Sequence, residues 1–359
     1  MNRIQGLGAI TVKRMAERFG SLAAVFDASE NDLLSVQGIG AERAALFSAE
    51  LKRARIDDEV ERASRSRVRL VTWADDEYPS LLKQIADPPM VLYVSGSPKV
   101  LSAPCVAIIG TRHPTVYGRE TARRLGFQLA AAGYTVVSGL ALGIDTEAHV
   151  GALQAKGHTT AVLGGALDCL FPRENTALAR DIVQKEGAVV TEYPFGRQPD
   201  RQTFPMRNRI VSGLCKGVLV VEAPLNSGTL ITVGQALDQG RTVMAIPGRV
   251  DSPSSQGCHR LLREGARLVT TADEVIEELQ DLLPRSAGET EKSASAAIVL
   301  SAEERAVLAC VGTEGAHVDD VVRGSGVDAG TVNATVVGLQ LKRLVRLLPG
   351  GMVFRNNHL

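Results

Sequence analysis

The sequence predicts a protein of the α/β class, built on a central parallel sheet with helices on both faces. Six apolar runs in the middle of the chain each end in glycine, serine or an acid, at Gly110, Ser138-Gly139, Gly164-Gly165, Glu192, Glu222 and Gly248. Segments with helical spacing separate these runs, which is typical of parallel strands that are buried on both faces. Because ligands of open parallel sheets bind beyond the carboxyl ends of the strands, these strand ends predict a site for a phosphate-bearing ligand.

The helices between the strands are expected to end at glycines, the residue type that most often follows a helix. Three stretches show this pattern: 119–132 before Gly133, 145–156 before Gly157 and 229–239 before Gly240. The preceding stretch 77–96 is expected to contain a lead-in strand of the same sheet. We expect residues 63–283 to form this core.

Residues 1–62 are expected to form a small helical domain with a weak internal repeat. The turns Gly6-Leu7-Gly8 and Gly38-Ile39-Gly40 each precede a stretch of helical spacing. A glycine turn that opens a helix presents backbone N–H groups, as helix-hairpin-helix modules do to DNA phosphates. Since basic residues are not in excess here, a helical domain whose glycines only make tight turns is an equally good interpretation.

The C-terminal part is expected to form a separate module. Residues 284–297 are small and polar and predict a flexible linker. Residues 298–359 contain three stretches of helical spacing, followed by an alternating stretch around Pro349-Gly350-Gly351 that predicts a hairpin. Three helices and a hairpin are typical of a winged helix, which binds duplex DNA or a protein. With few basic residues near the wing, protein or structural use is favoured; those residues are Lys342, Arg343, Arg346 and Arg355.

The composition excludes several classes of protein. The 359 residues carry 40 basic and 40 acidic side chains, so no bulk charge attracts nucleic acid or anionic membrane, and any anion site must be local. The five cysteines are scattered and never form a C-x-x-C pair, which argues against a disulfide framework and a zinc site; Cys105 and Cys169 are expected to be buried packing residues. No apolar run has membrane-spanning length, and a cytoplasmic protein is expected.

The turn from Gly110 to Gly118 is the first candidate site. Glycine permits close backbone approach, the following helix start offers free N–H groups, and Arg112 can bind a phosphate with two donors. Residues 110–124 contain four arginines and one glutamate, a local excess in a neutral protein. The turn lacks the patterns of dinucleotide and nucleoside-triphosphate loops. Thr111 and Tyr117 belong to the same turn, and the alternative is a tight turn with Arg112 in a surface ion pair.

The stretch from Ser138 to His149 is the second. Asp145 and His149 are four residues apart and therefore share one helical face, as an acid–base pair would. Because no nucleophile accompanies them, we favour a structural interpretation. In it, Asp145 stabilises the helix start and His149 is its hydrogen-bonded neighbour.

Two further runs complete the candidate site. Phe204, Arg207, Asn208 and Arg209 combine charge with a stacking face, which suits single-stranded nucleic acid. The alternative is a surface loop held by salt bridges to Glu192 or Glu222. In the other run, Ser227 and Thr229 can cap a helix while Gly228 leaves room for a phosphate.

Taken together, these motifs resemble the DNA-processing protein A (DprA/Smf) family. The matching pieces, in order, are EYPSLLKQIADPPMVLYVSG, VAIIGTRHPTVYG, VVSGLALGIDTEAH, AVLGGALDCLFPREN, TEYPFG, FPMRNRIVSGL, VVEAPLNSGTLIT and AIPGRV. They cover about residues 78–270. The flanking helical and winged-helix-like modules also suit this family.

The resemblance implies a Rossmann-like core that binds single-stranded DNA in a basic pocket at the strand ends, without catalysis, metal or cofactor. It implies a homodimer that protects incoming DNA, relieves the block by single-strand-binding protein and loads the RecA recombinase during natural transformation. Phe171 stands where the family often has tyrosine, which keeps a stacking face and loses the hydroxyl. The expected DNA-binding residues are Gly110, Thr111, Arg112, Tyr117, Gly118, Ser138, Gly139, Gly164, Gly165, Phe171, Arg173, Phe204, Arg207, Asn208, Arg209, Ser227, Gly228 and Thr229.

The alternative is an enzyme of a related Rossmann-like family that hydrolyses the N-glycosidic bond or the phosphate of a nucleotide. Glu192 and Glu222 at strand ends could then serve as acid or base. The turn that such enzymes build from glycines reads NSGTLIT here, with a serine and no glycine run. The DNA-binding interpretation is therefore favoured.

Overall fold

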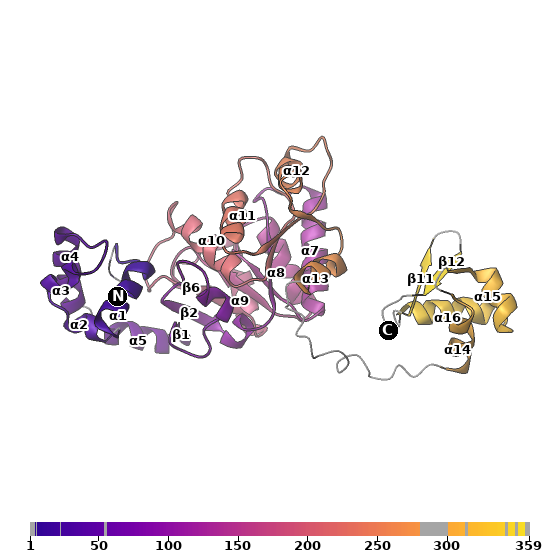
Figure 1. The fold of residues 1–359 in the computed structure, drawn as a ribbon, viewed down its shortest axis with the longest axis horizontal. Helices are drawn as coiled ribbons and strands as arrows, with labels where there is room; N and C mark the ends of the chain where they lie inside the picture. Colours follow the sequence, from indigo (N-terminus) through magenta and orange to yellow (C-terminus); the bar gives the residue numbers. More distant parts are fainter. Residues whose placement is uncertain are drawn as a thin grey trace. The chain divides into compact units, whose positions relative to one another are not determined.

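A computed structural model describes residues 4, 6–21, 23–53, 56–280, 301–312, 315–341, 344–348 and 351–355. The chain divides into two compact units, Met1–Leu283 and Pro284–Leu359, drawn in Figure 1 from indigo to orange and in yellow. The linker expected at 284–297 lies outside the described residues. The boundary expected between 1–62 and 63–283 stays a prediction.

A nine-stranded sheet forms the centre of the first unit, in the order β1-β2-β6-β5-β4-β3-β7-β8-β9. The six apolar runs are strands β3 to β8, and they pair in parallel as predicted, with β9 continuing the parallel part. The lead-in strand β2 joins one edge in antiparallel pairing, beside β1. Strands β1 and β9 were not predicted. The strands are β1 (Val68–Thr72), β2 (Val91–Gly96), β3 (Cys105–Ile109), β4 (Thr135–Ser138), β5 (Thr159–Val162), β6 (Ala188–Thr191), β7 (Gly217–Val220), β8 (Thr242–Ala245) and β9 (Arg267–Leu268).

The strand order reverses at β3. From β3 the chain adds β4, β5 and β6 on one side, and it then returns to add β7, β8 and β9 on the other side. The connections that leave β3 and β7 therefore run to opposite faces of the sheet, which opens a crevice between their carboxyl ends. This arrangement places the strand-end residues of β3, β4 and β7 around one hollow.

Helices cover both faces of the sheet. Successive residues of β3 alternate between two cores: Val106 and Ile108 pack in one, and Cys105, Ala107 and Ile109 pack in the other. The first face carries α7 (Val116–Ala131), α8 (Ile144–Gln154), α9 (Thr176–Gln184) and α13 (Ala272–Gln280). The second carries α6 (Ser80–Lys83), α10 (Thr203–Gly213), α11 (Thr229–Asp238) and α12 (Gln256–Arg263). Helices α7, α8 and α11 match the three predicted helices to within three residues at each end.

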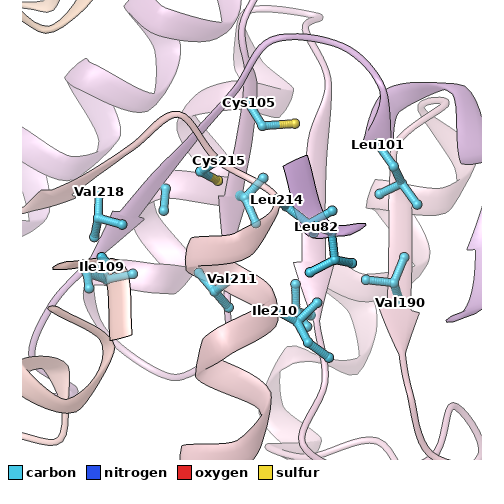
Figure 2. Close-up of a cluster of buried hydrophobic side chains, with 14 of the residues drawn as sticks. Leu82, Leu101, Cys105, Ile109, Val190, Ile210, Val211, Leu214, Cys215 and Val218 are labelled. Atoms are coloured by element: carbon cyan, nitrogen blue, oxygen red, sulfur yellow. The ribbon is translucent and has the colours of Figure 1, made fainter. Parts of the chain in front are cut away.

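Helix α10 packs against the sheet through one apolar side. Figure 2 shows Ile210 and Val211 of this helix, and Leu214 at its C-cap, facing the side chains of Ile109, Val190 and Val218 from the strands. All six are at most 5% exposed. This contact fixes the rotation of α10, and with it the directions of its polar residues.

The N-terminal helices form their own apolar core around Met15, Leu33 and Phe47. Arg43 donates to the carbonyl oxygens of Gly6 (2.8 Å) and Gly38 (3.2 Å), so one side chain holds both glycine turns together. The helices are α1 (Ala9–Phe19), α2 (Ala24–Asp27), α3 (Glu30–Leu34), α4 (Ala41–Arg53) and α5 (Ile56–Arg65), and the last leads into β1. In Figure 1 they gather beyond the β1 edge of the sheet.

The second unit has the three helices and the hairpin expected of a winged helix. Its elements are α14 (Ala302–Ala309), β10 (Ala316–His317), α15 (Val318–Ser325), α16 (Ala329–Leu341), β11 (Val345–Leu348) and β12 (Met352–Arg355). Strand β12 pairs with both β11 and the unpredicted β10. Lys342 and Arg343 lie outside the described residues.

Two expectations from the composition concern the whole chain. Cys105 is buried, as predicted, but Cys169 is only half-buried, because it lies in the loop after β5 rather than in the sheet. Among the described helices none combines the length and apolar character that crossing a membrane requires.

Candidate nucleic-acid interface

A cavity of about 460 Å³ lies at the carboxyl ends of β3, β4 and β7; we call it the strand-end pocket. Four segments line it: the loop after β3, the loop after β4, one side of α10, and the turn that begins α11. Of the predicted site residues it contains Gly110, Thr111, Arg112, Gly139, Phe204, Arg207, Asn208, Ser227, Gly228 and Thr229. Four motifs that are far apart in the sequence thus meet in one place.

Glu222 holds the first wall of the pocket in position. Its carboxylate accepts from the backbone N–H (2.9 Å) and the hydroxyl (2.6 Å) of Thr115, and its carbonyl oxygen accepts from the N–H of Thr111 (2.7 Å). Thr115 also caps α7. The side chain of Glu222 therefore fixes the loop that carries Arg112.

Gly118 belongs to this support rather than to the binding surface, which corrects the prediction for it. A Cβ atom at Gly118 would overlap the carboxylate of Glu222. The residue is buried in the first turn of α7 and does not line the pocket. The glycine is needed for close approach to a protein carboxylate, not to a phosphate.

The replacement Gly118→Ala should lower the free energy of unfolding by about 1–3 kcal/mol, the usual cost of overpacking. The matched control is Gly234→Ala on α11, where an added Cβ meets nothing within 4 Å and stability should rise by about 0.4–1 kcal/mol. Both are measured by urea unfolding followed through Trp73, the single tryptophan of the chain. Equal stability of the two variants would contradict this role for Gly118.

Arg207 is a buried positive charge at the floor of the pocket, with 6% of its surface exposed. Its Nη1 donates to the carbonyl oxygens of Gly139 (2.6 Å) and Val162, and its Nε donates to Asn208 Oδ1 (3.2 Å). Burial lowers its pKa to about 10, partly opposed by the charge of Asp145, so the guanidinium stays charged at neutral pH. Gly139 is required beside it, because a Cβ there would overlap the guanidinium.

Asp145 lies in the same pocket and balances this charge. Burial raises the pKa of its carboxyl, whereas Arg207 and the N–H groups of Ala141 and Gly139 oppose the shift. Those N–H groups donate to Oδ2 at 3.3 Å and 3.0 Å. The favoured structural interpretation of Asp145 agrees with these contacts, since it holds the loop after β4 against the start of α8.

His149 is not the hydrogen-bonded neighbour of Asp145 that we expected. Its Nδ1 lies 2.7 Å from the hydroxyl of Thr159 on β5, and the ring is fully buried. Burial lowers its pKa to about 3. Although the two residues share a helical face, the ring lies against the sheet, where β5 offers a closer partner.

The neutral, buried His149 should make stability fall in mild acid. An unfolded chain binds a proton at this residue below about pH 6.5, whereas the folded chain does not do so until about pH 3, so stability is lost as pH falls between these values. Between about pH 8 and about pH 5 the loss should be about 2 kcal/mol. In the His149→Asn variant, the free energy of unfolding should not show this fall of about 2 kcal/mol. Urea unfolding at the two pH values checks it, and an unchanged slope in the variant would contradict the assignment.

Arg112 and Phe204 form the exposed mouth of the pocket. The guanidinium of Arg112 lies 5.6 Å from the ring centroid of Phe204 and is solvent-exposed. In the described parts of the chain it makes no ion pair within 4 Å, which leaves its donors available to an anion. The ring of Phe171, 50% exposed, lies 5.9 Å from that of Phe204. A free guanidinium beside two rings can hold a phosphate and its base.

The turn before α11 lines another side of the pocket. Gly228 is the N-cap residue and offers no side chain to cap the helix, and the N–H groups of Leu230 and Ile231 donate to the carbonyl oxygens of Ser227 (3.1 Å) and Gly228 (3.2 Å). Ser227 accepts from the N–H of Thr229 (3.2 Å), and the two hydroxyls are 2.8 Å apart. Of the two residues expected to cap the helix, only Ser227 bonds a backbone N–H of its first turn. A helix start flanked by two hydroxyls and facing a pocket that contains Arg112 favours an anion.

Arg209 does not belong to the pocket, although it was predicted there. It is 7% exposed, its Nη2 lies 2.5 Å from Glu192 Oε2, and its Nε lies 3.4 Å from Asp87 Oδ2. Residues on a helix turn by about 100° each, so Arg207 and Arg209 point about 200° apart. The alternative, a salt bridge to Glu192, is present. Arg209 forms it from helix α10 and not from a surface loop.

Other predicted site residues, Phe171 among them, also lie outside the lining of the pocket. Ser138 is buried and donates to the carbonyl oxygen of Ile108 (2.6 Å), and the hydroxyl of Tyr117 donates to that of Pro247 (3.1 Å). Cβ atoms at Gly164 and Gly165 would lie 2.8 Å from Phe204 and Pro199, so these glycines make room for protein side chains. Arg173 lines a different cavity, beside α9.

The pocket also contains residues that the sequence did not single out for binding, chiefly His113, Asn226 and Thr232. Their positions next to the Gly110 and Ser227 turns are the one sequence feature that could have indicated their place in the pocket. Among the described residues, no group of three or more His, Cys, Asp and Glu side chains is placed to hold a metal ion.

A mostly parallel α/β sheet whose reversal point carries an exposed arginine beside an aromatic ring defines a class of α/β protein with a ligand crevice at the strand ends. Comparison with known proteins identifies which one. The chain belongs to the DNA recombination-mediator protein A family, whose model matches residues 69–280.

The flanking modules match as well. Residues 1–53 match a SAM-like helix-hairpin-helix tandem, and residues 291–351 match the DprA winged helix domain. Protein Smf of Synechocystis sp. is 32% identical to this chain over 381 aligned residues, which cover 97% of this chain and 96% of that protein. The predicted fold class and family are confirmed.

Two solved structures of the family are similar to this one. The X-ray structure of DNA processing protein A from Streptococcus pneumoniae has a TM-score of 0.68 and 34% identity, and covers 77% of this chain and 95% of its own. DNA processing protein A from Helicobacter pylori, whose structure is described for its single-stranded DNA binding mode, has a TM-score of 0.54 and 31% identity. It covers 60% of this chain and 98% of its own.

Proposed function

We propose that this protein binds single-stranded DNA in the strand-end pocket and loads the RecA recombinase on it during natural transformation, without catalytic turnover. The observation that carries the proposal is the exposed guanidinium of Arg112 beside Phe204, in a pocket that the start of α11 also lines. A backbone phosphate binds the guanidinium near the positive end of the α11 dipole, and a base stacks on the ring. Membership of the DNA recombination-mediator family supports the same ligand.

The DNA-binding part is tested by fluorescence anisotropy of a labelled mixed-sequence single strand, with a duplex competitor and a salt series. Affinity should fall with salt, with a log–log slope of about −0.7 for each phosphate contacted. Duplex should compete poorly, because stacking on Phe204 requires an unpaired base. Affinity that does not depend on salt, or equal competition by duplex, would remove the proposal.

The proposed protein partners are RecA, single-strand-binding protein and a second copy of this chain. In a filament-assembly assay on single strands coated with single-strand-binding protein, adding this chain should shorten the lag before RecA polymerises. Arg112→Ala should lengthen the lag again, since the variant binds the strand more weakly. A lag that is the same with and without the protein would contradict RecA loading and leave DNA binding standing.

A further inference from the structure

A second cavity, of about 610 Å³, lies beside α9; we call it the α9 cavity. It is lined by α9, by residues of β2 and β6, and by the loop after β5. Its apolar wall is built from Leu167, Leu170, Val183 and Val189. The proposed function so far gives this cavity no role.

Two arginines at its rim have exposed side chains. Arg173 and Arg180 both line the cavity. In the described residues neither makes an ion pair within 4 Å, so their charges are available to an anion. The acid in the lining, Asp168, is already engaged, because it pairs with Arg62 (2.7 Å) and accepts from the N–H of Gly196 (2.9 Å). The rim therefore presents net positive charge above an apolar wall.

Phe171 links the segment that lines the α9 cavity to the strand-end pocket. Leu170 and Arg173 line the α9 cavity, and Phe171 between them places its half-exposed ring 5.9 Å from Phe204, which lines the strand-end pocket. A strand that leaves the first site over these two rings would reach Arg173 at the second. Continuity of this kind, together with charge, favours nucleic acid over a separate small ligand.

We propose that the α9 cavity is a second nucleotide subsite for the same single strand. Arg173 and Arg180 bind backbone phosphates, the apolar wall accepts a base, and Phe171 bridges the two sites. This inference rests on the proposed function. It adds that the strand runs from the reversal point of the sheet toward α9.

The test compares affinities for a labelled single strand of about 4 nucleotides, which fits one site, and one of about 16, which can occupy both. Arg180→Ala should weaken binding of the long strand by about 3- to 10-fold and make its salt slope less negative by about 0.7, and should leave the short strand unchanged. Arg180→Glu should have a larger effect. Lys185→Ala, which removes a charge from the end of α9 outside the cavity, is the matched control.

The outcomes separate this inference from the proposed function. If Arg180→Ala changes neither strand while Arg112→Ala weakens both, the subsite is wrong and the strand-end pocket stands. If neither variant changes binding of either strand, the proposed function fails as well. If Arg180→Ala instead weakens binding of a protein partner and not of DNA, the cavity is a peptide site and the subsite is overturned.

Discussion

Arg112→Ala is expected to weaken binding of single-stranded DNA by about 10- to 100-fold, with no change in stability. Hydrogen bonds to charged groups contribute about 1.5–3 kcal/mol, and 1.4 kcal/mol is a factor of ten in affinity. The side chain is exposed, and its described contact is the ring of Phe204, so its loss should change the free energy of unfolding by less than about 1 kcal/mol. The effect should be similar for all sequences, because phosphate contacts carry no base information.

Anisotropy titrations and urea unfolding of the same preparation measure both quantities. The control is Arg69→Ala, which removes an equal charge at a position on β1 away from the pocket. In the wild type, Arg69 forms an exposed ion pair with Glu77. The affinity of this control variant should match that of the wild type. An Arg112→Ala variant that binds like the control would show that the guanidinium does not contact the strand.

Arg209→Ala is expected to have the largest effect on stability, a loss of about 3–5 kcal/mol, because it removes one partner of a buried ion pair. The side chains of Arg209 and Glu192 are 9% and 14% exposed, so solvent screens the pair little. Burial raises the pKa of Glu192, and the charge of Arg209 opposes that shift. Arg209→Lys keeps the charge and should lose less.

Urea unfolding followed through Trp73 measures this loss. Arg249→Ala is the matched control, because the Arg249–Asp251 pair has side chains 83% and 64% exposed and should contribute less than about 1 kcal/mol. A stable Arg209→Ala variant with weakened DNA binding would contradict the structural role and return Arg209 to the list of DNA contacts.

The difference between Arg207 and Arg209 shows what the sequence could not predict. In the sequence, residues 204–209 (FPMRNR) form one basic run beside an aromatic residue. Helix α10 separates the two arginines because Pro205 falls in its first turn, where proline is tolerated. The residue that could have indicated this helix in the sequence is Asp200. Its carboxylate accepts from the N–H groups of Gln202 (2.8 Å) and Thr203 (2.9 Å) at the start of the helix.

The strand ends were predictable for the opposite reason. Parallel strands are buried on both faces, so each appears as a continuous apolar run with a clear end. The residue at that end, such as Gly110 or Ser138, is visible in the sequence, but the order of strands is not. Only the order places β3 beside β7 and so brings the Ser227 turn opposite Arg112. Ser138 lies at such an end as well, yet its hydroxyl donates to the carbonyl oxygen of Ile108 and is not free for a ligand.

Photo-cross-linking tests the central claim, that a single strand occupies the strand-end pocket, most directly. A strand that carries a photoreactive base is irradiated with the full-length protein, and the attached tryptic peptides are identified by mass spectrometry. Attachment is expected at peptide 202–207, which contains Phe204, and at peptide 157–173, which contains Phe171. Attachment confined to the N-terminal helices or to the winged helix would contradict this claim.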